Sequence, residues 1–183
     1  MRIIAGNYRG RVLKSPANLK TRPTSDRLRE TLFNILQPKI NENTYFLDLC
    51  AGTGAIGIEA LSRGAAFVTF VEISRKICGL IEENLDNLQI PEEQTEIICE
   101  KANKFLEKNN KGFDLVYFDP PYQSDYFQII EKFSEVNSKI LRPKGVFVAE
   151  HSSKIVLPDL VGELRRWRLL KQGDSCLSFY ERE

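Results

Sequence analysis

The sequence predicts an α/β fold in which a mostly parallel sheet carries helices on both faces. Between residues 44 and 150, short runs rich in β-branched and aromatic residues alternate with stretches whose apolar residues recur at helical spacing. The first of these runs leads into the glycine-rich segment 51–57, as in nucleotide-binding α/β units. Such alternation requires crossover connections, which make the strands parallel and place ligand sites at their carboxyl ends.

The chain begins with a predicted hairpin and a helix. Apolar positions in 2–5 and 11–13 flank residues 6–10, which contain two glycines, and this is typical of two short paired strands. After Pro23, apolar residues at helical spacing predict a helix that packs on the sheet, and Ser25 and Asp26 can cap its first turn.

Strands and helices then alternate in order. Strands are expected at 44–50, 67–71, 95–99, 113–119 and 145–150, and helices at about 55–63, 74–88, 102–108 and 125–141. The stretches 167–170 and 176–180, joined by a Gly-Asp turn, predict a terminal hairpin with an antiparallel last strand. We therefore expect a seven-stranded, mostly parallel sheet.

Length and composition indicate one hydrophobic core. The chain has 183 residues, of which 42% are hydrophobic and 28% charged. No apolar run approaches the roughly 18 residues of a membrane span, and no signal-peptide pattern begins the chain, so we expect a cytoplasmic protein without membrane contact. We expect a basic N-terminal hairpin or arm at 1–22 and the α/β domain at 23–183.

The glycine-rich turn predicts a cofactor site. Gly52 and Gly54 permit the backbone angles and close approach that a ligand needs, and Gly57 allows the following helix to pack tightly on a strand. Glu72, about 20 residues on, is placed to bind ribose hydroxyls. An NAD-dependent oxidoreductase would share these features. Asp48 weakly favours another cofactor, because an acid there would repel a pyrophosphate but could accept a hydrogen bond from an ammonium group or a water molecule.

The tetrapeptide Asp119-Pro120-Pro121-Tyr122 ends the apolar run 113–118 and predicts a site for an amine on a flat base. Two prolines stop the strand and leave the carbonyls of Asp119 and Pro120 as acceptors. An NH2 group has two donors, one for the Asp119 carboxylate and one for the Pro120 carbonyl, while Tyr122 can stack on the ring. An ordinary strand-to-loop turn is the alternative.

Together, the segment 48–54, Glu72 and Asp119-Pro-Pro-Tyr resemble the class I S-adenosylmethionine-dependent methyltransferases that methylate exocyclic amines of nucleobases. The segments 1–11, 21–34 and 57–65 and the tail 171–182 are similar to the RsmD family of bacterial 16S rRNA guanine-N2 methyltransferases. This resemblance runs nearly end to end.

The resemblance implies methyl transfer from S-adenosylmethionine, with S-adenosylhomocysteine as product, to the N2 amine of a guanine in 16S rRNA, at the guanine-966-type position. No metal is implied. The implied catalytic residues are Asp119, Pro120, Pro121 and Tyr122, and the implied cofactor-binding residues are Asp48, Ala51, Gly52, Thr53, Gly54, Glu72, Ile73 and Ala102. Many class I methyltransferases have an acid before the position of Ala102, where this chain has Lys101, so the adenine contact would use the Ala102 amide or Asn103.

Basic charge is concentrated at the N-terminus. Residues 1–29 carry eight Lys or Arg and one acid, whereas the remainder has a net charge of −6. This asymmetry suits binding to a phosphate backbone, although a solvated basic arm would show it as well. The expected RNA-binding residues are Arg2, Tyr8, Arg9, Arg11, Lys14 and Arg22. The expected partner is 16S rRNA within an assembling small ribosomal subunit, bound by a monomer.

Two further functions remain open from the residues alone. An adenine-N6 methyltransferase acting on DNA or RNA would share both motifs, because Asp-Pro-Pro-Tyr recognises an amine and not guanine in particular. A non-catalytic RNA-binding module would keep the basic arm but need not retain a complete cofactor site. The single histidine, His151, follows a strand and is more typical of a surface or loop residue than of a catalytic base.

Overall fold

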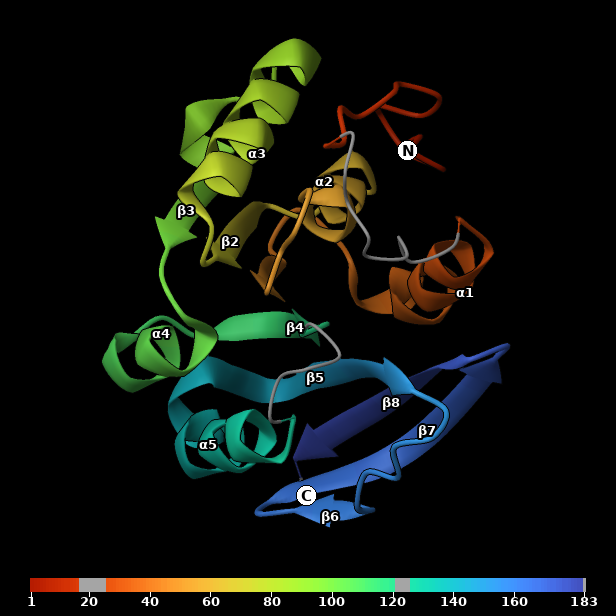
Figure 1. The fold of residues 1–183 in the computed structure, drawn as a ribbon, viewed down its shortest axis with the longest axis vertical. Helices are drawn as coiled ribbons and strands as arrows, with labels where there is room; N and C mark the ends of the chain where they lie inside the picture. The colour runs from red at the N-terminus through yellow and green to blue at the C-terminus, as the bar shows by residue number, and fades with distance from the viewer. Residues whose placement is uncertain (17–25, 121–125, 183) are drawn as a thin grey trace.

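The computed structural model describes residues 1–16, 26–120 and 126–182, and within them the chain forms one sheet flanked by helices (Figure 1). The elements are α1 (Asp26–Leu36), β1 (Tyr45–Leu49), α2 (Ala55–Ser62), β2 (Phe67–Glu72), α3 (Arg75–Leu88), β3 (Thr95–Cys99), α4 (Ala102–Lys108), β4 (Phe113–Phe118), α5 (Tyr126–Ile140), β5 (Leu141–Ser152), β6 (Leu160–Val161), β7 (Leu164–Gln172) and β8 (Ser175–Arg182), with short 3-10 turns at Gln37–Lys39 and Glu92–Gln94. No helix in these ranges is both long and apolar enough to cross a lipid bilayer.

The strand order is β3-β2-β1-β4-β5-β8-β7-β6. Strands β1 to β5 pair in parallel, and β8, β7 and β6 add to the β5 edge in antiparallel fashion. The predicted fold class is confirmed. The described part of the sheet has eight strands and not seven, because the two-residue strand β6 pairs with the start of the long strand β7.

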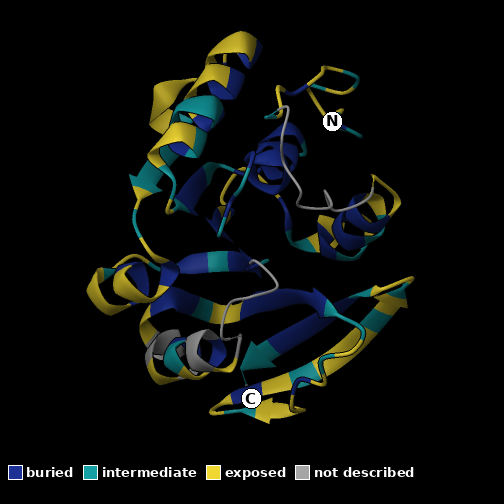
Figure 2. Cartoon of the chain, viewed as in Figure 1, coloured by how far each residue is buried: buried dark blue, intermediate teal, exposed yellow. Residues whose placement is uncertain are grey.

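Helices cover both faces of the sheet, as predicted (Figure 1). Apolar side chains of α1, α2 and α3 form one core cluster with one face of the strands, and those of α4 and α5 form a second cluster with the other face. Figure 2 shows the central strands and α2 largely buried, while α1, α3 and α4 carry exposed residues along one side. This is the layering that βα alternation requires, because each helix hides one apolar stripe against the sheet.

The N-terminal hairpin packs against α2. Arg2 and Val12 form its antiparallel bridge, and the side chains of Ile3 and Leu13 are buried in the same core cluster as α1 and α2. The backbone N–H groups of Ile4 and Ala5 donate to the carboxylate of Glu59 at 2.8 and 3.0 Å. The first 14 residues are therefore fixed to the domain by apolar burial and by a buried carboxylate.

Candidate cofactor and catalytic site

Acidic side chains gather where neighbouring parallel strands end. Asp48 lies near the end of β1, Glu72 is the last residue of β2, Asp119 follows β4, and Glu150 lies near the end of β5. Because parallel strands share one direction, these residues lie along the same edge of the sheet. The sequence prediction that the glycine-rich turn and Asp119 lie at one edge is confirmed by the strand order.

The glycine-rich turn has the predicted backbone geometry. Gly52 and Gly54 have positive φ angles of 53° and 76°, and a Cβ built on Gly52 would meet no atom within 4 Å. A Cβ on Gly57 would lie 2.3 Å from the ring of Phe70 on β2, so only glycine lets α2 approach the sheet this closely. Gly52 thus faces open space in which a ligand can approach the backbone.

Cys50 also has a positive φ, of 72°, which is unusual for a residue with a side chain. Its N–H and that of Ala51 both donate to the Val71 carbonyl, which ties the turn to β2. Burial, together with the carboxylates of Glu72, Asp119 and Asp48, raises the pKa of the Cys50 thiol to about 12. The thiol is therefore neutral, and this residue shapes the turn without supplying a nucleophile.

Glu72 and Asp48 hold the turn from two sides. One oxygen of Glu72 accepts from the Gly52 N–H at 3.0 Å and the other from the Ser74 N–H at 2.9 Å. Asp48, 1% exposed, accepts from the Gly57 N–H at 2.9 Å. Burial, opposed by the Gly57 N–H and assisted by the Glu72 charge, raises the pKa of Asp48 to about 7. Each carboxylate therefore fixes part of the glycine-rich turn by accepting a hydrogen bond from its backbone.

Ile73 and Ala102 flank the same edge. The side chain of Ile73 is 61% exposed directly after Glu72, so it is not a core residue, and an exposed apolar side chain here can cover a planar ring. Ala102 begins α4 and is buried, and Lys101 before it is exposed. Thr53 is buried, and its carbonyl accepts from the Asn84 amide at 3.4 Å.

The structure describes Asp119 and Pro120 but not the predicted catalytic residues Pro121 and Tyr122, which lie outside the described residues. Asp119 is half-buried and Pro120 is buried. Burial raises the pKa of the Asp119 carboxyl well above its usual range, and the charges of Glu150 and Asp48 raise it further. Asp119 is therefore a better proton acceptor than an exposed aspartate.

Sequence reasoning missed Glu150 and Tyr117. The hydroxyl of Tyr117, which is 1% exposed, donates a hydrogen bond to Oε2 of Glu150, which is 6% exposed. The available signal was an acid that closes the apolar run 145–149, as Asp119 closes 113–118. His151, by contrast, is buried and not a surface residue, since its ring contacts the Ser178 hydroxyl at 2.9 Å. Burial lowers the pKa of His151.

The predicted RNA-binding residues differ in how freely they can reach a ligand. Arg9 is exposed, whereas Arg11 donates to the Asn87 carbonyl at 3.0 Å and Lys14 pairs with Glu83 at 3.1 Å. Tyr8 is half-buried against the core cluster. Arg2 donates to the Gly10 carbonyl within the hairpin. Arg22 lies outside the described residues.

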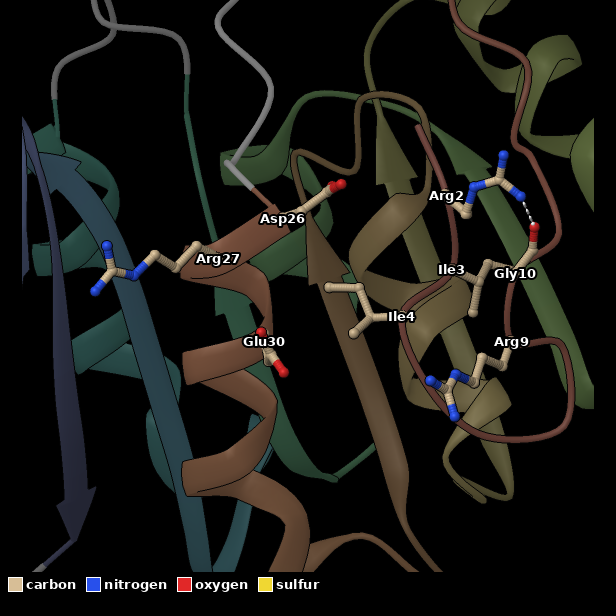
Figure 3. A pocket seen from close by; sticks show the side chains of 8 residues that line it. All are labelled: Arg2, Ile3, Ile4, Arg9, Gly10, Asp26, Arg27 and Glu30. Carbon is tan, nitrogen blue, oxygen red and sulfur yellow. Dashed lines mark hydrogen bonds between the residues drawn. The ribbon is translucent and has the colours of Figure 1, made fainter.

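A cavity of about 380 Å³ lies between this hairpin and the first turns of α1 (Figure 3). Its lining includes Arg2 and Arg9 but none of the predicted cofactor or catalytic residues that the structure describes. In Figure 3 the guanidinium groups of Arg2, Arg9 and Arg27 lie apart from one another, so they do not converge on one anion. This cavity is separate from the strand-end site.

The strand-end residues fit a nucleoside cofactor. An open backbone at Gly52, a carboxylate at Glu72 and an exposed apolar side chain at Ile73 follow one another along the edge. The open backbone suits an extended polar chain of a cofactor, the carboxylate suits the hydroxyls of a ribose, and the apolar side chain suits a planar ring. In the described ranges, no group of three or more His, Cys, Asp or Glu side chains has an arrangement that could hold a metal ion.

Residues 1–181 match the family described as Conserved hypothetical protein 95. The chain belongs to this family. The resemblance to the RsmD family is thereby confirmed, and the relatives agree with it. The protein named Ribosomal RNA small subunit methyltransferase D from Haemophilus influenzae is 36% identical over 186 residues, covering 98% of this chain and 91% of the relative. The protein of the same name from Escherichia coli K12 is 33% identical over 183 residues, covering 100% and 90%.

Solved structures of this family have the same fold. The yhhF protein of Escherichia coli superimposes with a TM-score of 0.87 at 33% identity, covering 100% of this chain and 98% of that one. Beyond the family, a crystal structure of SMU.776 complexed with SAH has a TM-score of 0.67 at 13% identity, covering 83% and 48%. At that identity the likeness concerns the fold alone. The fold is therefore the class I methyltransferase fold.

Proposed function

We propose that the chain transfers a methyl group from S-adenosylmethionine to the exocyclic N2 amine of a guanine in 16S rRNA. One observation carries the proposal: the glycine-rich turn follows β1, and Asp119-Pro120 follows β4, which pairs directly with β1. A cofactor on the turn and a base against Asp119 would therefore meet at one edge of the sheet. The full-length relatives named as small-subunit rRNA methyltransferases support the choice of RNA.

The glycine-rich turn and its neighbours would hold the cofactor. S-adenosylmethionine supplies an electrophilic methyl group on a sulfonium sulfur. The backbone of 51–54 and the Asp48 carboxylate would hold its amino-acid part. Each oxygen of Glu72 accepts one backbone N–H and can accept a further hydrogen bond, here from a ribose hydroxyl. Ile73 would cover the adenine ring, and the Ala102 N–H or Asn103 would contact its edge.

Asp119 and Pro120 would hold the amine. The N2 lone pair of guanine is delocalised into the ring, so hydrogen bonds from its N–H groups to the Asp119 carboxylate and the Pro120 carbonyl favour a more tetrahedral, nucleophilic nitrogen. Tyr122 would stack on the base. Correct positioning of the two reactants can be worth about 7–11 kcal/mol. The base must be unpaired or flipped to enter, which costs least in an RNA loop.

The proposal extends to the target nucleotide, the form of the RNA substrate and the segment that binds it. By family resemblance the target is the guanine-966-type position, presented on an assembling small subunit in the cytoplasm, and the enzyme acts as a monomer with residues 1–22 as its RNA-binding arm. Buried contacts of the hairpin with α2 support an arm held in a fixed position, as RNA placement requires.

The direct test is tritiated methyl transfer from S-adenosylmethionine to rRNA and to assembled small subunits from a strain lacking the enzyme, followed by nucleoside analysis. We expect N2-methylguanosine at one position, with subunits the better substrate. N6-methyladenosine would replace the guanine assignment with the adenine-N6 function. Absence of transfer to every substrate, with RNA binding retained, would indicate a non-catalytic RNA-binding module.

Asp119→Ala is the matched variant for this assay. It should lower the single-turnover rate by about 10²–10⁴-fold, since it removes a group that orients and deprotonates the amine. S-adenosylhomocysteine affinity, measured by calorimetry, should stay within about twofold, because the proposed partner of Asp119 is the base. Retention of more than about a third of the wild-type rate would contradict the role of Asp119.

A further inference from the structure

Glu150 is the neighbour of Asp119 across the sheet. Phe118 on β4 pairs with Ala149 on β5, so the next residues, Asp119 and Glu150, stand side by side on strands about 4.8 Å apart. Paired positions of parallel strands point to the same face, and Glu150 interacts electrostatically with Asp119. Two carboxyl groups therefore share one half-buried site.

Tyr117 holds Glu150 from within the same face. It lies two residues before Asp119, and side chains two apart on a strand point to the same side. Its hydroxyl donates to Oε2 of Glu150, which fixes the position of that carboxylate. Across β5, Glu150 pairs with the apolar Leu177 on β8, which offers no competing charge.

Other charged or titratable groups face this cluster from the elements packed against it. From α1, the buried guanidinium of Arg29 interacts with Tyr117. From β1, Asp48 pairs with Tyr117 across the ladder and interacts with Asp119. Beyond β1, the neutral Cys50 thiol also interacts with Asp119, and Glu72 at the end of β2 interacts with Asp48.

We propose that Glu150, held by Tyr117, is a positioning residue that enables Asp119 to accept the proton released by the amine. Its negative charge beside Asp119 stabilises a proton on the Asp119 carboxylate. This inference rests on the proposed methyl transfer and adds a role for the residue next to Asp119 on the neighbouring strand.

The proton balance is simple. Methylation leaves one positive charge on the exocyclic nitrogen. One N–H bond then breaks, its electron pair stays on nitrogen, and the proton bonds to a carboxylate oxygen of Asp119. Tyr117 remains the hydrogen-bond donor to Glu150 throughout. The proton passes to water when the product leaves, and no further reactant is needed.

The experiment compares pH profiles of single-turnover methyl transfer between pH 5.5 and 9 for the wild type, Glu150→Gln and Asp114→Asn. Glutamine can still accept the Tyr117 hydrogen bond but carries no charge. In the profile of rate against pH, the acid limb is the part where the rate falls as Asp119 becomes protonated. For Glu150→Gln this limb should move to lower pH by about one unit, because a like charge next to Asp119 is removed. Asp114, at the other end of β4, pairs with Arg142, and its variant should leave the limb unmoved.

Tyr117→Phe should move the limb in the same direction by less, because Glu150 loses the hydrogen bond that holds its carboxylate beside Asp119. An unmoved limb in both Glu150→Gln and Tyr117→Phe, with S-adenosylhomocysteine affinity as in the wild type, overturns the proposal. A lower rate without a limb shift means a purely structural role and overturns it too.

A carbon-13 NMR titration of the Asp119 carboxyl, assigned with Asp119→Asn, tests the same coupling without any turnover. Its midpoint should fall in Glu150→Gln, and an unchanged midpoint overturns the proposal. Together with the activity assay, the NMR titration distinguishes failure of the proposed function from failure of the role of Glu150. If the wild type methylates no rRNA, the proposed function fails, whereas methylation with an unmoved limb and midpoint refutes only the role of Glu150.

Discussion

Glu72 shows how one carboxylate can serve both the turn and the cofactor. Its oxygens accept from Gly52 and Ser74, and each keeps a lone pair that can accept a hydrogen bond from the proposed ribose. Glu72→Ala should weaken S-adenosylhomocysteine binding by roughly 1.5–3 kcal/mol, as for the loss of hydrogen bonds to a charged group. Calorimetry measures this, with the exposed Glu82→Ala on α3 as a control that should bind as the wild type does. Unchanged affinity in a folded Glu72→Ala protein would show that the ribose is bound elsewhere.

Asp48 makes stability depend on pH. Its folded-state pKa of about 7 lies above the ordinary value of 3.8, so the folded state holds the proton more tightly than the unfolded chain does. The resulting stabilisation is present below pH 3.8 and is lost as pH rises toward 7.

Asp48→Asn removes this titration while keeping an oxygen for the Gly57 N–H. Relative to the wild type, the variant should therefore gain stability between pH 5 and 7, by at most about 1.4 kcal/mol per pH unit. Urea unfolding of both proteins without cofactor at pH 5, 6 and 7 checks this. A stability difference that is constant over this range would mean that Asp48 titrates normally.

At the scale of elements, the packing of α2 on the sheet depends on Gly57. Gly57→Ala should destabilise the protein by about 1–3 kcal/mol, because the new Cβ would lie 2.3 Å from the Phe70 ring and overpack the core. Gly79→Ala on α3 is the matched control. No atom lies within 4 Å of its Cβ position, so helix propensity should make it stabilising by about 0.5–1 kcal/mol. Denaturant unfolding measures both, and equal effects would refute the packing argument.

The hairpin and α2 act as one unit through Glu59. This fully buried carboxylate accepts from Ile4, Ala5 and Arg63, and Arg29 on α1 lies 4.0 Å away. A buried carboxylate with this many donors holds the N-terminal segment in one orientation. The basic residues of the hairpin are thereby fixed relative to the glycine-rich turn that precedes α2.

At the scale of the whole molecule, charge segregation should govern RNA capture. Arg9 is an exposed predicted RNA contact, so Arg9→Ala should leave cofactor binding intact and lower the slope of log affinity against log salt by about 0.7. Lys104→Ala, exposed on α4 at the opposite face of the sheet, is the control with the same change in charge. Filter binding of rRNA at several salt concentrations measures both. Equal slopes for Arg9→Ala and the wild type would place RNA on another surface.

The sequence by itself determined the α/β class, the order of the elements and the two motifs at the sheet edge. These depend on local patterns: apolar spacing separates helix from strand, the glycines at 52, 54 and 57 fix a turn, and prolines after Asp119 end a strand. Parallel strands then bring their ends to one edge without further information. The resemblance to the family added the methyl donor and the RNA.

Only the tertiary structure decided which side chains meet. Glu150 becomes the neighbour of Asp119 because β5 pairs with β4 in a register that no local pattern specifies. Contacts between different segments of the chain likewise determine three local features. These are the positive φ of Cys50, the short strand β6 and the hydrogen bonds from the N-terminal backbone to Glu59. Strand order and register are set by packing across the whole sheet, and so is the environment that raises the pKa of Asp119.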